Sequence, residues 1–199
     1  MKKVKIFAHR GSSAYAPENT LEAFRLAMEQ GADGIELDVQ LTKDGVPVVI
    51  HDERIDRVSQ GKGAVRDYTL EELQKIRVPN GMSRYQDAQI PTLRQVLDLV
   101  KPSCMEVNIE LKTGIYWYPE IEEKVLELVS RAGMEERVIY SSFNHYSIGR
   151  ILREKPDAET AYLFSDIIVN VHEYARKNQV KGLHPGRHHI GMGFLQEYL

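Results

Sequence analysis

Short apolar, β-branched segments alternate with longer segments of helical periodicity along almost the whole 199-residue chain. Strand-like segments lie at residues 4–8, 34–41, 46–51, 105–111, 137–142, 160–164 and 180–184. Helix-like segments lie at residues 20–30, 92–100, 119–132, 146–154 and 170–177. Serial alternation of this kind is typical of βα units, so we predict an α/β fold whose strands run parallel.

Local signals mark the start and the end of the first helix. Asn19 occupies the expected N-cap position, with Glu22 three residues later, and Gly31 follows the helical pattern as a stop. The type of each element is therefore supported by more than periodicity.

Residues 52–91 interrupt the alternation. This stretch is polar and contains three glycines, and its only short helical piece is expected at residues 69–76. Long connections in compact domains usually serve a function or are disordered. We predict one domain, residues 1–199, with a small insertion at about 52–91 after the third strand.

The strand count fits an incomplete barrel. A closed (β/α)8 barrel needs eight strands, whereas about seven are expected here, and residues 186–199 read as a loop and one short helix. The predicted fold class is therefore a TIM (β/α)8-type barrel that lacks a strand. Such a barrel exposes two strand edges, which a homodimer or strand exchange would cover.

Charge and composition exclude several classes of partner. Lys and Arg number 26 and Asp and Glu 29, a net charge of −3, so binding to nucleic acid or an anionic membrane surface is not expected. No run approaches the ~20 apolar residues of a membrane span, and the N-terminus lacks the apolar core of a signal peptide. Cys104 is the single cysteine, which favours a reducing compartment, and we predict a cytoplasmic protein.

Polar side chains gather where four of the predicted strands end. These groups are His9-Arg10, Glu36-Leu37-Asp38, His51-Asp52 and Glu110-Leu111-Lys112. Since side chains of a strand alternate between its faces, Glu36 and Asp38 share one face, and Glu110 and Lys112 repeat this arrangement. The carboxyl ends of strands are where TIM-barrel active sites lie.

Carboxylates that converge inside a barrel repel one another unless a cation lies among them. Their hard oxygen atoms suit Mg²⁺ or Ca²⁺, so Glu36, Asp38 and Glu110 are candidate metal ligands. Arg10 and Lys112 would then bind a phosphate group beside the metal.

Each motif also has an ordinary interpretation. A single Glu-x-Asp is usually a solvent-facing stripe, and a lone histidine at a strand end is more often a hydrogen-bonded polar residue than a catalyst. The aromatic run at residues 116–118 either lines a pocket or packs within its loop. The joint occurrence of these motifs at strand ends favours an active site.

The same residues resemble the ordered motifs of the glycerophosphodiester phosphodiesterases. The resemblance covers nearly the whole chain, from Val4 to about Pro185. The matching segments are Ala8-His9-Arg10-Gly11, Ala16-Pro17-Glu18-Asn19-Thr20, Glu36-Leu37-Asp38-Val39, Val49-Ile50-His51-Asp52, Ile109-Glu110-Leu111-Lys112 and Ser141-Ser142-Phe143.

The resemblance implies a TIM-barrel enzyme that hydrolyses glycerophosphodiesters to glycerol 3-phosphate and an alcohol. It implies that His9 and His51 act as general acid and base, and that a divalent cation, Ca²⁺ or Mg²⁺, is bound by the three carboxylates. Substrate and phosphate binding fall to three further residues, namely Arg10, Lys112 and Phe143.

The sequence departs from this family after Pro185, where family members continue into an eighth strand with a tryptophan-containing segment. Two alternatives remain beside the active enzyme, the first because of this departure and the second because it shares the two-histidine chemistry. One is a non-catalytic remnant that binds metal or phosphate. The other is a lyase similar to phosphatidylinositol phospholipase C, which stops at the cyclic phosphate.

Overall fold

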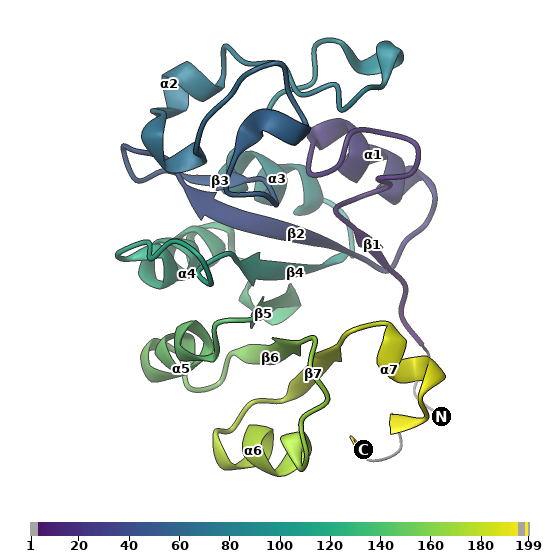
Figure 1. Ribbon diagram of the computed structural model, residues 1–199, viewed down its shortest axis with the longest axis vertical. Coiled ribbons are helices and arrows are strands. Elements are labelled where there is room, and N and C mark those ends of the chain that lie inside the picture. Colours follow the sequence, from purple (N-terminus) through teal and green to yellow (C-terminus); the bar gives the residue numbers. More distant parts are fainter. Residues whose placement is uncertain (1–3, 195–197, 199) are drawn as a thin grey trace.

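The computed structural model describes residues 4–194 and 198 as one curved, seven-stranded sheet with helices on its outer face (Figure 1). Six strands follow one another in parallel in the order β1-β2-β4-β5-β6-β7. These strands are β1 (Phe7–His9), β2 (Gly34–Leu41), β4 (Glu106–Leu111), β5 (Val138–Ser142), β6 (Glu159–Phe164) and β7 (Gly182–Pro185). The α/β class and the incomplete TIM-type barrel are confirmed.

The remaining strand, β3 (Pro47–Val49), runs antiparallel to β2, so the prediction of parallel pairing is wrong for this strand. A tight turn explains its direction: the Thr42 N–H donates to the Val46 carbonyl, and Gly45 has a φ of 74°. A parallel crossover requires a dozen or more residues, and this connection is too short for one. The described chain therefore has six parallel strands, two fewer than a closed barrel.

The helices bury their apolar stripes against the outer face of the sheet. They are α1 (Leu21–Glu29), α3 (Leu93–Val100), α4 (Ile121–Ala132), α5 (His145–Glu154) and α6 (Val171–Lys177), with α7 (His188–Gly191) after β7. Ile35, Leu37 and Val39 of β2 join this core, so the side chains between them point to the opposite, inner face.

The first helix is capped by a different residue from the one expected. Thr20 is the N-cap of α1, and its side chain accepts a hydrogen bond from the Ala23 N–H. Asn19 lies one residue earlier with a φ of 58°, and its amide reaches Asp38 instead. The capping prediction was wrong because Thr20 and Asn19 are both good N-cap residues.

The segment from residue 50 to residue 92 packs around a small apolar cluster of its own. It contains α2 (Leu70–Leu73) and three single-turn helices, Ile55–Arg57, Val65–Asp67 and Ser83–Tyr85. Its cluster includes Val48 of β3, which fixes the segment beside the β2–β3 hairpin. The description of residues 1–199 as one domain with an insertion stays a prediction.

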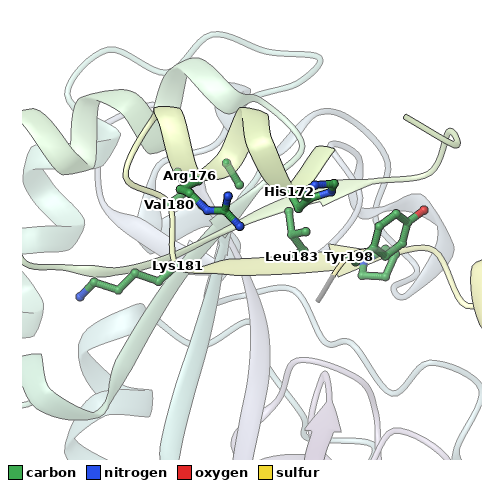
Figure 2. A pocket seen from close by; sticks show the side chains of 8 residues that line it. His172, Arg176, Val180, Lys181, Leu183 and Tyr198 are labelled. Atoms are coloured by element: carbon green, nitrogen blue, oxygen red, sulfur yellow. The ribbon is translucent and has the colours of Figure 1, made fainter. Parts of the chain in front are cut away.

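The arc of strands is open between β1 and β7, since neither pairs with a further strand in the described part of the chain. A groove of about 510 Å³ borders β7 and α6, and Figure 2 shows His172, Arg176, Leu183 and Tyr198 around it. Three strands separate β7 from β2, so this groove is distinct from the polar strand ends.

None of the helices formed by residues 4–194 and 198 combines the length and apolar character that crossing a bilayer requires.

Candidate active site

The strand register brings the three predicted carboxylates together on the inner face of the sheet. His9 of β1 aligns with Glu36 of β2, and Asp38 of β2 aligns with Glu110 of β4. One oxygen atom from each of Glu36, Asp38 and Glu110 lies within 4.8 Å of the others. The three residues are almost fully buried.

The predicted phosphate-binding cations lie against this acidic cluster. The Lys112 ammonium donates to Glu110 Oε1 at 2.9 Å and lies 3.9 Å from Asp38 Oδ1. Arg10 Nε lies 3.4 Å from Asp38 Oδ2. The two positive charges therefore offset only part of the charge that three ionised carboxylates would bring.

Electrostatic strain in the cluster indicates that it fits a cation. Burial, followed by the negative charge of Asp38, raises the pKa of Glu36 to about 8. The same two causes raise the pKa of Glu110. Asp38 Oδ1 is buried without a hydrogen-bond partner in the described structure. A divalent cation held by these three residues would supply positive charge and accept that oxygen as a ligand.

The turn after β1 places Arg10 beside the cluster, and Arg10 adopts a strained, left-handed backbone conformation there. Arg10 has a φ of 57°, and its N–H points to both the carbonyl and the Oε2 atom of Glu36, each at 3.0 Å. The next residue must be glycine, since a Cβ on Gly11 would lie 2.7 Å from the backbone of Ala23. Strained backbone of this kind concentrates at functional sites.

The antiparallel direction of β3 brings His51 to the same place as His9. Val39 pairs with Leu111 on one edge of β2 and with Val49 on the other, so β3 occupies the edge that β1 occupies earlier. The chain then returns toward the acidic cluster, and the Ile50 N–H donates to the Asp38 carbonyl. His51 therefore reaches the site because β3 is antiparallel, and not from the end of a parallel strand as the alternation of segments predicts.

The two histidines have different surroundings. Partial desolvation of the ring and the positive charge of Arg10 lower the pKa of His9, and His51 adds to this effect. His9 Nε2 lies 3.9 Å from Glu36 Oε2. His51 Nδ1 instead lies 2.6 Å from Asp52 Oδ1.

The state of Asp52 fixes the tautomer of His51. Hydrogen bonds from Arg57 lower the pKa of Asp52 to about 2, so this carboxylate is ionised at neutral pH and can only accept. His51 Nδ1 must then carry a proton. In the neutral ring, Nε2 is then the nitrogen without a proton.

Phe143 follows β5 and is half exposed at the end of that strand. It is the one predicted substrate-binding residue for which the structure gives no polar contact with the cluster, as expected for an apolar side chain.

Several residues that hold the site were not predicted as site residues. Asn19 donates from Nδ2 to Asp38 Oδ2 at 2.8 Å, and Glu18 accepts from Arg10 at 2.9 Å. Both belong to the Pro17-Glu18-Asn19-Thr20 run, which had been interpreted only as a helix start and a family motif. The available signal was that Asn19 and Thr20 can each cap a helix, whereas only one of them can occupy the N-cap position.

A buried amide supports the segment that carries His51. Gln40 Nε2 points to the carbonyls of Ile50, His51 and Asp52 at 3.2, 3.0 and 2.7 Å, and the Tyr118 hydroxyl donates to Gln40 Oε1. Tyr118 is 4% exposed and packs against β2, so its contact reaches beyond the loop of residues 116–118.

Removing this amide is expected to destabilise the protein. Gln40→Leu leaves the Tyr118 hydroxyl and the carbonyls of the His51 segment without partners, so the free energy of unfolding should fall by about 2–4 kcal/mol. Tyr118→Phe removes one hydrogen bond and should cost about 1 kcal/mol. Urea unfolding measures both, with Tyr116→Phe as a matched control that keeps the ring contact with Arg66. Equal stability of Gln40→Leu and wild type would contradict a structural role for the amide.

Comparisons with known proteins agree with this architecture. The model of the glycerophosphoryl diester phosphodiesterase family matches residues 9–196. A glycerophosphodiester phosphodiesterase of Caldanaerobacter subterraneus is 46% identical over 184 residues, which are 92% of this chain and 76% of that relative. One from Bacillus altitudinis is 48% identical over 91% of this chain and 75% of its own.

Solved structures of similar proteins share the fold. An Oleispira antarctica phosphodiesterase in complex with the product sn-glycerol-3-phosphate is 31% identical with a TM-score of 0.83, over 92% of this chain and 74% of that one. A glycerophosphodiester phosphodiesterase of Thermotoga maritima is 32% identical with a TM-score of 0.72, over 93% and 75% of the two chains. The motifs, the barrel and these likenesses together establish that the chain belongs to the glycerophosphoryl diester phosphodiesterase family.

Proposed function

We propose that this protein is a divalent-cation-dependent glycerophosphodiester phosphodiesterase that releases glycerol 3-phosphate and an alcohol. The convergence of Glu36, Asp38 and Glu110 with two cations and two histidines carries this proposal. Family membership supports the reaction class, and the product bound to the Oleispira antarctica relative supports the choice of product.

Glu36, Asp38 and Glu110 would hold the cation, Ca²⁺ or Mg²⁺, since both prefer oxygen ligands. The bound cation would offset negative charge on the phosphodiester and help to orient it. Arg10 and Lys112 are proposed to bind the phosphate oxygens from the two sides of the cluster, where their charges oppose the extra charge of a pentacoordinate transition state. Phe143 is proposed to contact the apolar part of the substrate.

His9 is proposed as the general base. Its lowered pKa leaves the ring unprotonated near neutral pH, as removal of a proton from the glycerol 2-hydroxyl requires. That oxygen would attack phosphorus to form a cyclic phosphate. His51, doubly protonated with Nδ1–H held by Asp52, would give its Nε2 proton to the leaving alcohol. The neutral Nε2 would then take a proton from the water that opens the cyclic phosphate, and protonated His9 would return its proton to the glycerol 2-oxygen.

Product analysis with and without chelator tests the proposal. Purified protein is incubated with glycerophosphocholine and Ca²⁺ or Mg²⁺, with and without excess EDTA, and products are followed by ³¹P NMR. Metal-dependent glycerol 3-phosphate is the expected result. Accumulation of cyclic phosphate would favour the lyase, and no turnover by folded, metal-binding protein would favour the non-catalytic remnant.

Quaternary structure and location complete the proposal. A homodimer would cover the open edges of β1 and β7, and the exposed side chains of Val4 and Ile6 beside β1 support contact there. Sedimentation equilibrium measures this directly. A cytoplasmic location is proposed because Cys104 has no cysteine to pair with.

A further inference from the structure

Arg57, in the 50–92 segment, contacts two residues of the site that follow different strands, namely Glu18 after β1 and Asp52 after β3. Arg57 ends the single-turn helix Ile55–Arg57, and its guanidinium contacts two carboxylates at once. Nε and Nη2 donate to Asp52 at 2.6 and 3.1 Å, and Nη1 and Nη2 donate to Glu18 at 2.8 Å each. A planar guanidinium supplies this double fork, which a lysine ammonium cannot reproduce.

We call the contacts of Arg57 with Asp52 and Glu18 the clamp. Through Asp52, the clamp reaches His51. Asp52 accepts from Arg57 mainly through Oδ2, which leaves Oδ1 directed at His51 Nδ1. A carboxylate fixed on its far side cannot rotate away from the ring. The contact therefore restrains both the orientation of the imidazole and the nitrogen that carries its proton.

The Glu18 side leads to the phosphate-binding arginine. Glu18 Oε1 accepts from both Arg57 Nη2 and Arg10 Nη1, and its side chain is 13% exposed. Arg10 in turn reaches Asp38 through Nε. One continuous chain of charged contacts thus runs from His51 to Asp38, with Arg57 in its middle.

We propose that Arg57 is a positioning residue, which orients His51 through Asp52 and Arg10 through Glu18 without touching substrate or metal. This role rests on the proposed phosphodiesterase function, because it assigns the clamp to the two groups that handle the leaving alcohol and the phosphate. The side chain is 44% exposed, so it adds little to the core that its loss would disturb.

Three variants separate positioning from general structural damage. Arg57→Leu removes both forks, and Arg57→Lys keeps the charge but cannot form them. Arg54→Leu is the matched control, because Arg54 lies in the same segment, is 58% exposed and pairs only with the surface residue Asp56 among the described contacts. Asp52→Asn provides the second arm of a double-mutant cycle.

In kinetic assays, Arg57→Leu is expected to lower kcat about 10- to 100-fold and to raise KM, with Arg57→Lys intermediate and Arg54→Leu unchanged. Asp52→Asn combined with Arg57→Leu should lower kcat by less than the product of the two single effects, because both act on the His51 ring. Additive losses of kcat, or equal losses in Arg54→Leu, would overturn the role.

The ¹⁵N shifts of the His51 ring provide a readout that does not depend on turnover. In wild type the shifts should report Nδ1–H, and in Arg57→Leu they should move toward the Nε2–H tautomer at unchanged melting temperature. Unchanged ring shifts in Arg57→Leu would overturn the proposal even in an active enzyme. If the wild type hydrolyses no diester, the proposed function fails, but the ring shifts still test whether Arg57 orients His51. Failure of the proposed function and failure of the positioning role are therefore distinguishable.

Discussion

Replacing His51 by alanine is expected to lower kcat for glycerophosphodiester hydrolysis about 10²- to 10⁴-fold, the usual contribution of a positioned general acid or base. His9→Ala should cause a loss of the same order. His51 Nδ1 is engaged by Asp52, so only its Nε2 remains to serve the leaving alcohol, whereas the lowered pKa of His9 suits a base. Steady-state kinetics with glycerophosphocholine measures both losses.

A substrate with a nitrophenol leaving group separates the two roles. Nitrophenolate leaves without protonation, so His51→Ala should recover most of its lost rate on such a glycerophosphodiester while His9→Ala should not. Equal recovery in both variants would reverse or remove the assignment. Full activity of either variant on glycerophosphocholine would contradict two-histidine catalysis altogether.

Replacing Glu36 by glutamine is expected to abolish most metal-dependent activity, about 10³-fold, while stabilising the metal-free protein at alkaline pH. Burial and Asp38 raise the pKa of Glu36 from 4.5 to about 8. Between these values the folded state holds a proton that the unfolded state releases. The metal-free wild type should therefore lose stability as pH rises from about 5 to above 8, by an amount on the order of 4 kcal/mol.

Thermal unfolding at several pH values checks this prediction. A chain of this size should show a fall in Tm of roughly 10 °C for that change in stability, and Ca²⁺ or Mg²⁺ should reverse it by binding the ionised cluster. Glu36→Gln, which carries no charge, should show a flatter profile and no rescue by metal. Glu29→Gln is a suitable control, since Glu29 is exposed at the end of α1 and lies outside the cluster. A wild-type profile that rises with pH in EDTA would contradict the strained cluster.

The acidic cluster was predictable because it depends on local rules. Alternation along a strand puts Glu36 and Asp38 on one face, and the parallel register of β2 with β4 places Asp38 opposite Glu110. The strand and helix segments were predictable for the same reason, with β2 matching its expected range of 34–41. The alternation and the element segments depend on residues that are neighbours in sequence, and the repeated Glu-x-Lys spacing at the end of β4 marked Glu110 as a further candidate.

The supporting contacts were not predictable from such patterns. Arg57 meets Glu18 across 39 positions of the chain, and Tyr118 meets Gln40 across 78. No periodicity links residues so far apart, and each of these side chains taken singly is compatible with a solvent-exposed surface. The packing of the 50–92 segment beside the β2–β3 hairpin brings Arg57 to Glu18, and the pairing of β2 with β4 brings Tyr118, which follows β4, to Gln40.

The sequence by itself determined which elements form, which carboxylates share a face, and to which family the chain is similar. The tertiary structure decided the direction of β3, and with it how His51 joins His9. The physical reason is the turn of residues 42–46, which is too short for a parallel crossover and folds the chain back along the edge of β2. β3, which is not one of the parallel strands of the barrel, therefore directs the following residue His51, a candidate catalytic residue, toward the acidic cluster.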